Sequence, residues 1–304
     1  MNAPADSAIA PGQRALGHVA MFVYATLVAG SFSFGALAAP HIGPSSLTAL
    51  RFVLAAALIG ALLKVTTRSV RISTGAFWRF IVLGALMGVF FVLMFVALRI
   101  TDPVSTGAVF TLIPLMSAFF GYVLLRQRTS ATVATSLLVS AIGALWVIFR
   151  GDLDRALAFD VGRGEALFFI GCACQAAYVP LVRMLNRGES ALEFTFWTLV
   201  AASLCLVLYA APEMIATDWS AMPMVVWYCL AYLTIFATAV SFFLLQFASL
   251  RLPAGKAFAY GYLIPSYVIL IEGLLGHGWS APFVAIGALI TVGGLIVLVV
   301  TPDE

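Results

Sequence analysis

The stretch FFVLMFVALR, residues 90–99, returns later in the chain as FFLLQFASLR, residues 242–251, with six of its ten positions identical. A second pair follows in the same order, because TLIPL at 111–115 corresponds to YLIPS at 262–266. Apolar stretches match one another easily by chance, so each pair alone is weak. Two pairs at offsets of 152 and 151 residues indicate that the second half of the chain repeats the first.

Composition places this repeated chain in a membrane. Of its 304 residues, 63% are hydrophobic and 10% are charged, whereas a soluble domain has roughly 25% charged residues. So little polar surface cannot cover a water-soluble globule. The net charge of +3 is spread between apolar runs and forms no basic patch, which argues against nucleic-acid binding.

The apolar runs predict an all-α polytopic membrane protein, because a helix of about 20 mostly apolar residues crosses the hydrocarbon core. The runs lack the alternation of barrel strands, the other structure that spans a membrane. Ten segments meet the length requirement: 17–39, 44–63, 77–98, 103–125, 131–149, 163–183, 192–211, 224–250, 254–276 and 281–301. They divide the chain into an N-terminal tail (1–16), a first five-helix repeat (17–150), a linker (151–162) and a second repeat (163–301).

The distribution of Lys and Arg predicts that both termini lie in the cytoplasm, since cytoplasmic loops carry the excess of these residues. With the N-terminus inside, four arginines fall outside: Arg99, Arg150, Arg155 and Arg163. Arg51 falls within a span. The remaining eleven fall inside: Arg14, Lys64, Arg68, Arg71, Arg79, Arg126, Arg128, Arg183, Arg187, Arg251 and Lys256. The linker is therefore expected on the external side.

The two repeats are predicted to be inverted. Corresponding elements are five spans apart, so each enters the membrane from the opposite side to its counterpart. A third pair, Gly143 and Gly294, keeps the offset of 151 residues. Inverted repeats are typical of secondary transporters, in which two halves rock around a site near the midplane.

Ten spans arranged as five plus five inverted, with Leu-Ile-Pro in the fourth and the ninth, resemble the EamA-type transporters of the drug/metabolite transporter superfamily. The resemblance covers residues 17–301. It implies that segments one, three, four, six, eight and nine line a central cavity. Members of that family export amino acids and other small metabolites from bacteria, and some carry vitamins, nucleotide sugars or drugs.

The segments that the resemblance places around the cavity supply a mixed aromatic and polar set. Amides such as Gln175 and Gln246 are the strongest candidates, because an amide in hydrocarbon seeks a partner or water. The predicted substrate-binding residues are Tyr24, Ser31, Ser33, Phe91, Met94, Phe110, Thr111, Gln175, Tyr178, Phe242, Gln246, Tyr260, Tyr262 and Glu272. Phenylalanines in such helices also pack against lipid or other helices, so packing is the alternative for each of them.

Two charged residues fall inside predicted spans. Glu272 is the only carboxylate well within one, and an ionisable group there suggests substrate or proton handling by default. Its alternative is to reach the outer interface. Arg51 could pair with Glu272, bind a substrate carboxylate through its planar donors, or hold its helix against a neighbour, and we favour the structural role.

Pro114 and Pro265 occupy matching positions in the two repeats. Each removes a backbone donor and is expected to bend its helix, next to the central site. Small residues form two further patterns: Gly84 with Gly88, and Ser136 and Ser140 with Gly143. These allow close helix packing, either within one protomer or between two in a homodimer.

No arrangement of residues points to an enzyme, a metal site or a cofactor. Cys172 and Cys174 have no histidine nearby and lack zinc spacing. No Gly-rich phosphate loop is present, so coupling to a proton gradient or to the solute's own gradient is expected. The sequence favours export of an amino acid or similar zwitterion across the bacterial inner membrane. Uptake of a vitamin or nucleoside-like solute is the alternative, and a membrane-embedded enzyme is a third, less favoured one.

Overall fold

The computed structural model describes residues 11–66, 76–127, 130–148, 152, 154, 161–252, 254–279 and 282–300. Over these residues the chain is helical and has no β-strand. The predicted linker at 151–162 and the first ten residues of the predicted tail lie largely outside the described residues. The prediction of an all-α membrane protein is confirmed, since eight helices are long and apolar enough to cross a membrane.

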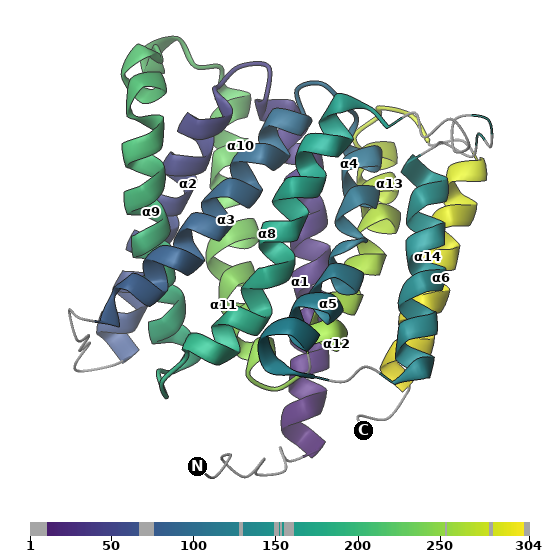
Figure 1. The fold of residues 1–304 in the computed structure, drawn as a ribbon. Coiled ribbons are helices and arrows are strands. Elements are labelled where there is room, and N and C mark those ends of the chain that lie inside the picture. The colour runs from purple at the N-terminus through teal and green to yellow at the C-terminus, as the bar shows by residue number, and fades with distance from the viewer. Residues whose placement is uncertain are drawn as a thin grey trace.

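The first half of the chain forms six helices in the described residues (Figure 1). Its fourth predicted segment is divided into two helices. The bounds are α1 Pro11–Ala38, α2 Pro44–Thr66, α3 Trp78–Ala97, α4 Pro103–Phe110, α5 Ile113–Leu125 and α6 Ala131–Ile148.

The second half follows the same order and has more interruptions. A π-helix, η3, separates two of its helices, and a 3-10 turn, η4, separates two others. The bounds are α8 Arg163–Leu185, α9 Ala191–Ala216, η2 Trp219–Ala221, α10 Met224–Thr234, η3 Ile235–Val240, α11 Ser241–Ser249, α12 Ala254–Ala259, η4 Tyr260–Leu263, α13 Ile264–Leu274 and α14 Pro282–Val300.

Each predicted segment coincides with one helix or with a run of abutting helices. The largest difference is at the start, where α1 begins at Pro11, within the predicted tail. Gln13 explains part of this extension, because its side-chain oxygen accepts a hydrogen bond from Arg251 Nε at 2.9 Å. The first turns of α1 are thus held by the end of α11 and need no apolar surroundings.

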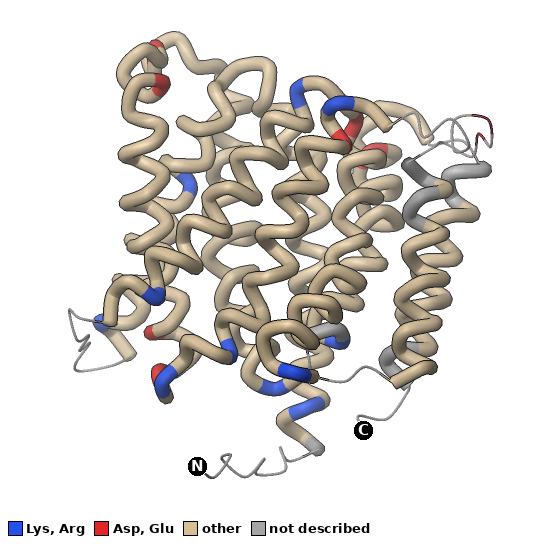
Figure 2. The backbone as a smooth tube through the Cα atoms, in the orientation of Figure 1, with Lys and Arg blue, Asp and Glu red and all other residues tan. Residues whose placement is uncertain are grey.

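The helices run up and down between two faces of the bundle. In Figure 1, α1 begins and α14 ends at the same face. From that face α3 runs to the opposite one, while its counterpart α10–α11 runs back. Figure 2 shows most of the described Lys and Arg residues at the face where α1 begins. Arg68, Arg71, Arg128, Arg150 and Arg155 lie outside the described residues.

The two matched prolines lie just after breaks in their helices. The α4 helix ends at Phe110, two tight turns follow, and Pro114 stands in the first turn of α5. Pro265 likewise stands in the first turn of α13, directly after η4. A proline in a first helical turn sacrifices no hydrogen bond, because its missing N–H would have no partner there. The chain therefore changes course at helix junctions that precede the prolines.

The residues at several helix starts explain why the helices begin there. Asp102 caps α4, with its carboxylate accepting from Ser105 N at 2.8 Å. Ser190 and Glu193 form a reciprocal capping box on α9. The start of α2 is capped from another helix, since Glu213 of α9 accepts from Ser46 N at 2.8 Å. A carboxylate at a helix N-terminus is favourable because unpaired N–H groups point at it.

The small-residue patterns are used within the chain. A Cβ on Gly84 would lie 2.5 Å from the backbone nitrogen of Ala202, so α3 and α9 touch backbone to backbone there. A Cβ on Gly143 of α6 would lie 2.9 Å from the carbonyl oxygen of Gly287 in α14. Both contacts join the first half of the chain to the second.

Candidate functional site

Two amide–tyrosine pairs lie at the centre of the bundle. Gln175 Nε2 of α8 donates to the Tyr24 hydroxyl of α1 at 3.4 Å. Gln246 Nε2 of α11 donates to the Tyr178 hydroxyl of α8 at 2.5 Å. All four side chains are buried. The first pair joins the two halves of the chain. Together the two pairs contain four of the predicted site residues.

Aromatic rings extend this centre toward α3. Phe91 of α3 stacks on Phe242 of α11, with ring centroids 6.1 Å apart, and the Tyr178 ring lies 6.3 Å from Phe242. Phe52 of α2 packs edge-on against both phenylalanines, at 5.4 and 5.5 Å. The amide–tyrosine pairs and these rings form one buried group, which we call the central cluster: Tyr24, Phe52, Phe91, Gln175, Tyr178, Phe242 and Gln246.

Phe110 belongs to a neighbouring aromatic group. Its ring lies 5.9 Å from that of Phe32 and 6.0 Å from that of Phe90, which in turn packs on Phe91 at 4.7 Å. Thr111 is buried, and its hydroxyl donates to the Ala108 carbonyl oxygen in the preceding turn at 2.6 Å. Met94 is also buried in the core. Of these three residues, Phe110 is connected to the cluster, through Phe90.

Arg51 lies at the edge of the central cluster and is fully buried. Its guanidinium carbon lies 4.3 Å from the centroid of the Phe91 ring. Arg51 Nε donates to Thr238 Oγ1 at 2.7 Å, and Nη2 donates to the Ala237 carbonyl oxygen at 2.9 Å. Both acceptors belong to the π-helix η3, so this side chain links α2 of the first half to the second half.

Several polar atoms of Arg51 and of the predicted site residues are buried without a hydrogen-bond partner. They are Oε1 of Gln175, Oε1 of Gln246, Nη1 of Arg51 and the hydroxyls of Ser31 and Ser33. Leaving such an atom unpaired costs about 1–3 kcal/mol. Atoms of this kind are suited to bind a polar solute or water, because either would supply the missing partner.

Glu272 does not pair with Arg51, so the ion pair that the sequence suggested between them is wrong. Glu272 Oε2 lies 2.8 Å from His277 Nδ1, at the end of α13. Tyr260 also lies apart from the cluster, with its hydroxyl 3.0 Å from His18 Nδ1. The carbonyl oxygen of Tyr262 accepts a hydrogen bond from Thr291 of α14 at 3.0 Å. The ninth segment is therefore anchored to α1 and α14 rather than to the central pairs.

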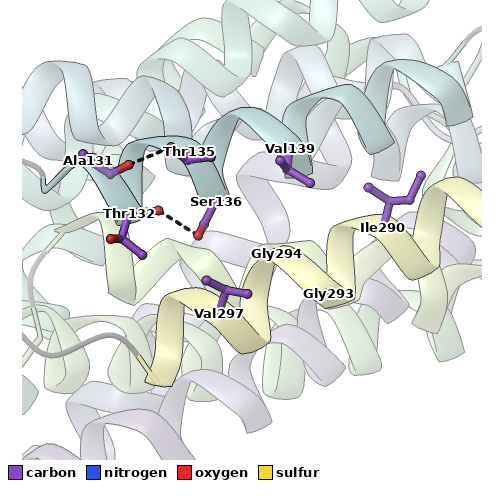
Figure 3. Close-up of a pocket in the computed structure, with 9 residues that line it drawn as sticks. All are labelled: Ala131, Thr132, Thr135, Ser136, Val139, Ile290, Gly293, Gly294 and Val297. Carbon is purple, nitrogen blue, oxygen red and sulfur yellow. Dashed lines mark hydrogen bonds between the residues drawn. The ribbon is translucent and has the colours of Figure 1, made fainter.

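A groove of about 700 Å³ lies between α6 and α14 and contains none of the predicted site residues. Two of its three hydroxyls bond within their own helix, since Thr135 donates to Ala131 O and Ser136 to Thr132 O (Figure 3). The groove is lined by Ala131, Thr132, Thr135, Ser136, Val139, Ile290, Gly293, Gly294 and Val297.

Metal-binding residues do not gather in the part of the chain that the structure describes. No group of three or more His, Cys, Asp or Glu side chains is close enough there to hold an ion. Cys172 and Cys229 are buried free thiols, and Cys172 lies in the apolar core beside Phe168 on the same helix. The central cluster can bind through hydrogen bonds and ring faces, and Arg51 at its edge adds one guanidinium.

The sequence did not single out Phe52, Phe95 or Thr238 as partners in this region. Phe91 and Phe95 are four residues apart and so share a face of α3, and both rings pack against the Arg51 guanidinium. That spacing could have indicated that the two rings face the same partner. The sequence gives no such indication for Thr238, because its position depends on the π-helix.

The fold and the cluster define a helical membrane protein whose buried centre carries polar and aromatic side chains from both halves of the chain. The family model for the EamA-like transporter family matches residues 15–149 and again residues 162–300. The chain therefore belongs to the EamA-like transporter family, and the predicted resemblance is confirmed. Since this family consists of transporters, the protein is not an enzyme.

Relatives and a solved structure agree with this placement. The chain is 24% identical over 283 residues to the uncharacterized transporter YyaM of Bacillus subtilis (strain 168), covering 92% of each protein. It is 21% identical to an uncharacterized transporter of Archaeoglobus fulgidus over 91% of this chain and 95% of that one. A crystal structure of another protein aligns with a TM-score of 0.70 and 19% identity, over 94% of this chain and 96% of that one. The last likeness concerns the fold alone.

Proposed function

We propose that this protein is a secondary transporter that moves a small organic solute across the bacterial inner membrane by alternating access. The solute class we infer is an amino acid or a related zwitterion, and the direction is export. Family membership supports transport. Energy would come from a proton gradient or from the solute gradient itself.

The proposed architecture is ten spans in two inverted repeats, residues 17–150 and 163–301, with both termini in the cytoplasm. The opposite directions of α3 and α10–α11 support the inversion (Figure 1). The gathering of Lys and Arg at the face where α1 begins supports the orientation (Figure 2). Two halves of opposite direction can rock around a shared centre, which is what alternating access requires.

The central cluster carries the proposal, because both halves contribute to it and its amides are incompletely bonded. Tyr24 and Gln175 face one another across the two halves, as do Phe91 and Phe242. The unpaired amide oxygens of Gln175 and Gln246 can accept hydrogen bonds from an ammonium group. The aromatic faces suit both a cation and an apolar side chain.

Counterflow in proteoliposomes tests this function. The purified protein would be reconstituted and assayed with radiolabelled L-leucine, L-phenylalanine and L-threonine. Gln175→Met and Gln246→Met each remove an amide while keeping a similar length, and for Gln246 methionine is also the residue at the matching position of the first repeat, Met94. We expect each substitution to reduce uptake about tenfold or more, since each removes a hydrogen bond to a charged group.

Thr48→Val is the matched control. Its hydroxyl is also buried within a helix, but it bonds only to the Pro44 carbonyl oxygen of its own helix. We expect this variant to transport as the parent does. Equal activity in Gln246→Met and Thr48→Val would remove the central cluster as the site, and a flat response to every amino acid would remove the proposed solute class.

A further inference from the structure

Arg51 is a buried base without an acidic partner. Its side chain is 0% exposed, about two turns from the start of α2. Among the described residues, no carboxylate forms an ion pair with it, and its two hydrogen-bond acceptors are the neutral oxygens of Thr238 and Ala237. A charge inside a membrane helix bundle is costly and is normally paired or functional. A guanidinium in these surroundings is suited to bind an anionic group.

The guanidinium is held in a fixed plane. The Phe91 and Phe95 ring centroids lie 4.3 and 5.5 Å from its central carbon, and the Phe52 centroid lies at 5.9 Å. Its Nη1 is buried with no hydrogen-bond partner. An arginine whose fork of donors is already oriented loses little freedom when it binds a carboxylate, and two parallel hydrogen bonds then form.

The acceptors of Arg51 belong to an unusual element. Ile235–Val240 is a π-helix, a rare conformation that is frequent at functional sites. Within it the Thr238 hydroxyl also donates to the Leu233 carbonyl oxygen at 2.7 Å. The bonds from Arg51 to this element cross between the two halves. Separation of the halves would break them and free two more donors on the same guanidinium.

The position of Arg51 connects it to the rest of the proposed site. Phe91 touches Arg51 on one side and stacks on Phe242 on the other. Phe242 leads to Tyr178, which accepts the hydrogen bond from Gln246. This chain of contacts connects a donor for an anion, Arg51, with an unpaired acceptor for a cation, Oε1 of Gln246.

We propose that Arg51 binds the carboxylate of the transported solute, exchanging its bonds to the π-helix for bonds to the solute. This inference rests on the proposed function and narrows it, because it makes a carboxylate obligatory. Amides of the same amino acids, which lack the anion, should be poor ligands.

The test compares each acid with its own amide. Melting temperatures of the purified protein in detergent would be measured with L-leucine, L-phenylalanine and L-threonine, and with L-leucinamide, L-phenylalaninamide and L-threoninamide. Each titration would be repeated on Arg51→Gln, Arg51→Lys and Thr238→Val. The last variant is the matched control, since it removes the Nε acceptor of Arg51 and leaves the charge in place.

We expect at least one acid to raise Tm while its amide binds about tenfold or more weakly, as the loss of a charge-assisted hydrogen bond predicts. Arg51→Gln should abolish the difference between acid and amide, and Arg51→Lys should retain part of it. Thr238→Val should keep the preference for the acid. The comparison in the parent protein needs no substituted chain, so a folding defect in Arg51→Gln does not remove the test.

Three results would overturn the inference: amides that bind as well as acids, a preference for the acid that survives in Arg51→Gln, or no response to any acid. Its failure is distinct from failure of the proposed function. Counterflow of an amide, with normal activity in Arg51→Gln, would support transport and exclude Arg51 as the anion site. A rise in Tm with an amino acid that depends on Arg51, without counterflow of any solute, would support the anion site and contradict transport.

Discussion

Arginine side chains in this protein bond repeatedly to backbone carbonyl oxygens at the ends of helices. Arg99 donates to the carbonyl oxygens of Ala39 and Ile42 in the turn that follows α1, both at 3.0 Å. Arg183 donates in the same way to Ser249 and Leu252 at the end of α11. The last carbonyls of a helix have no partner within it, so a cation there is favourable. Arg51 differs, because the carbonyl that it bonds is inside a membrane segment.

Arg79 combines such a contact with an ion pair. It donates to the Leu185 carbonyl oxygen at the end of α8, and its Nη2 lies 2.6 Å from Glu189 Oε1. Burial alone would raise the pKa of Glu189, but hydrogen bonds from Arg79 and from the Arg187 backbone N–H outweigh it. Together they hold the pKa of Glu189 below its usual value.

We predict that this carboxylate makes stability depend on acid pH. Because the pKa of Glu189 is lower in the folded protein, its stabilisation is complete above the unfolded pKa, about 4.3. It is lost as pH falls through the folded pKa. Glu189→Gln should cost about 1 kcal/mol at neutral pH, a value kept small because the carboxylate is 22% exposed.

Thermal unfolding in detergent from pH 7 to pH 3 measures this effect. The parent and Glu189→Gln should differ at neutral pH and converge at acid pH. Arg187→Gln is the control, since it keeps the backbone N–H that bonds Glu189 and should follow the parent curve. A constant difference at every pH would contradict the assignment.

At the scale of elements, helix pairs approach closely where small residues face a neighbouring backbone. Gly84 and Gly88 lie one turn apart on α3 and both face α9. A Cβ on Gly84 would lie 2.5 Å from the Ala202 nitrogen, whereas one on Gly88 would lie 3.2 Å from a methyl group of Leu206. A backbone atom cannot move aside as the end of a leucine can.

We predict that Gly84→Ala destabilises the protein by about 1–3 kcal/mol, the range for overpacking a filled interior. Gly88→Ala should change stability by less than about 1 kcal/mol, because a leucine rotamer can give way. The melting temperatures of the two variants in one detergent provide the measurement. Equal effects at both positions would mean that the two helices are further apart than the structure has them.

The breaks before Pro114 and Pro265 are also a property of elements. Each half of the chain interrupts one apolar segment at the same place, but the two interruptions differ. The first is a pair of tight turns at Thr111 and Leu112, and the second is the four-residue η4. The matched position indicates a shared architecture, whereas the type of turn differs between the two halves.

At the scale of the whole molecule, contacts between the halves occur at both ends of the bundle. At the end where α3 finishes and α8 begins, Thr101 donates to Glu165 at 2.6 Å. The α2 cap from Glu213 joins the halves at the same face. At the other end the Arg79–Glu189 pair also joins them. Contacts between the halves thus lie on both sides of the central cluster. Alternating access would break those at one end at a time.

We predict that the end bearing Arg79 and Glu189 faces the cytoplasm. His41→Cys and Arg187→Cys place thiols in exposed turns near opposite ends of the bundle, in a chain whose four native cysteines are replaced by alanine. A membrane-impermeant maleimide added to intact cells should label the cysteine at position 41. It should label the cysteine at position 187 only after lysis.

The cysteine-free chain is the control for background labelling. The reverse pattern of labelling would invert the proposed orientation, and labelling of both thiols in intact cells would contradict a polytopic arrangement with these loops on opposite sides. Counterflow activity of each variant would show that the labelled protein is the folded one.

Helix positions in this protein were predictable within a few residues over most of the chain. The hydrocarbon core leaves the backbone no partner but itself, so an apolar run of sufficient length is enough to specify a helix. The third segment, predicted as 77–98, is observed as Trp78–Ala97. The repeated stretches around Phe91 and Phe242 similarly indicated that α3 and α11 occupy corresponding positions, and those two rings stack on one another.

The partners of the buried polar groups depended on the three-dimensional packing. Gln175 and Tyr24 are 151 residues apart in sequence, and Arg51 and Thr238 are 187 apart. A membrane helix is apolar on nearly every face, so periodicity does not reveal which face meets which neighbour. Glu272 illustrates the point, because a carboxylate expected within a span lies beside His277 at a helix end. Chain composition specified the membrane helices, whereas the contacts between them brought Arg51, the π-helix and the two amide–tyrosine pairs to one place.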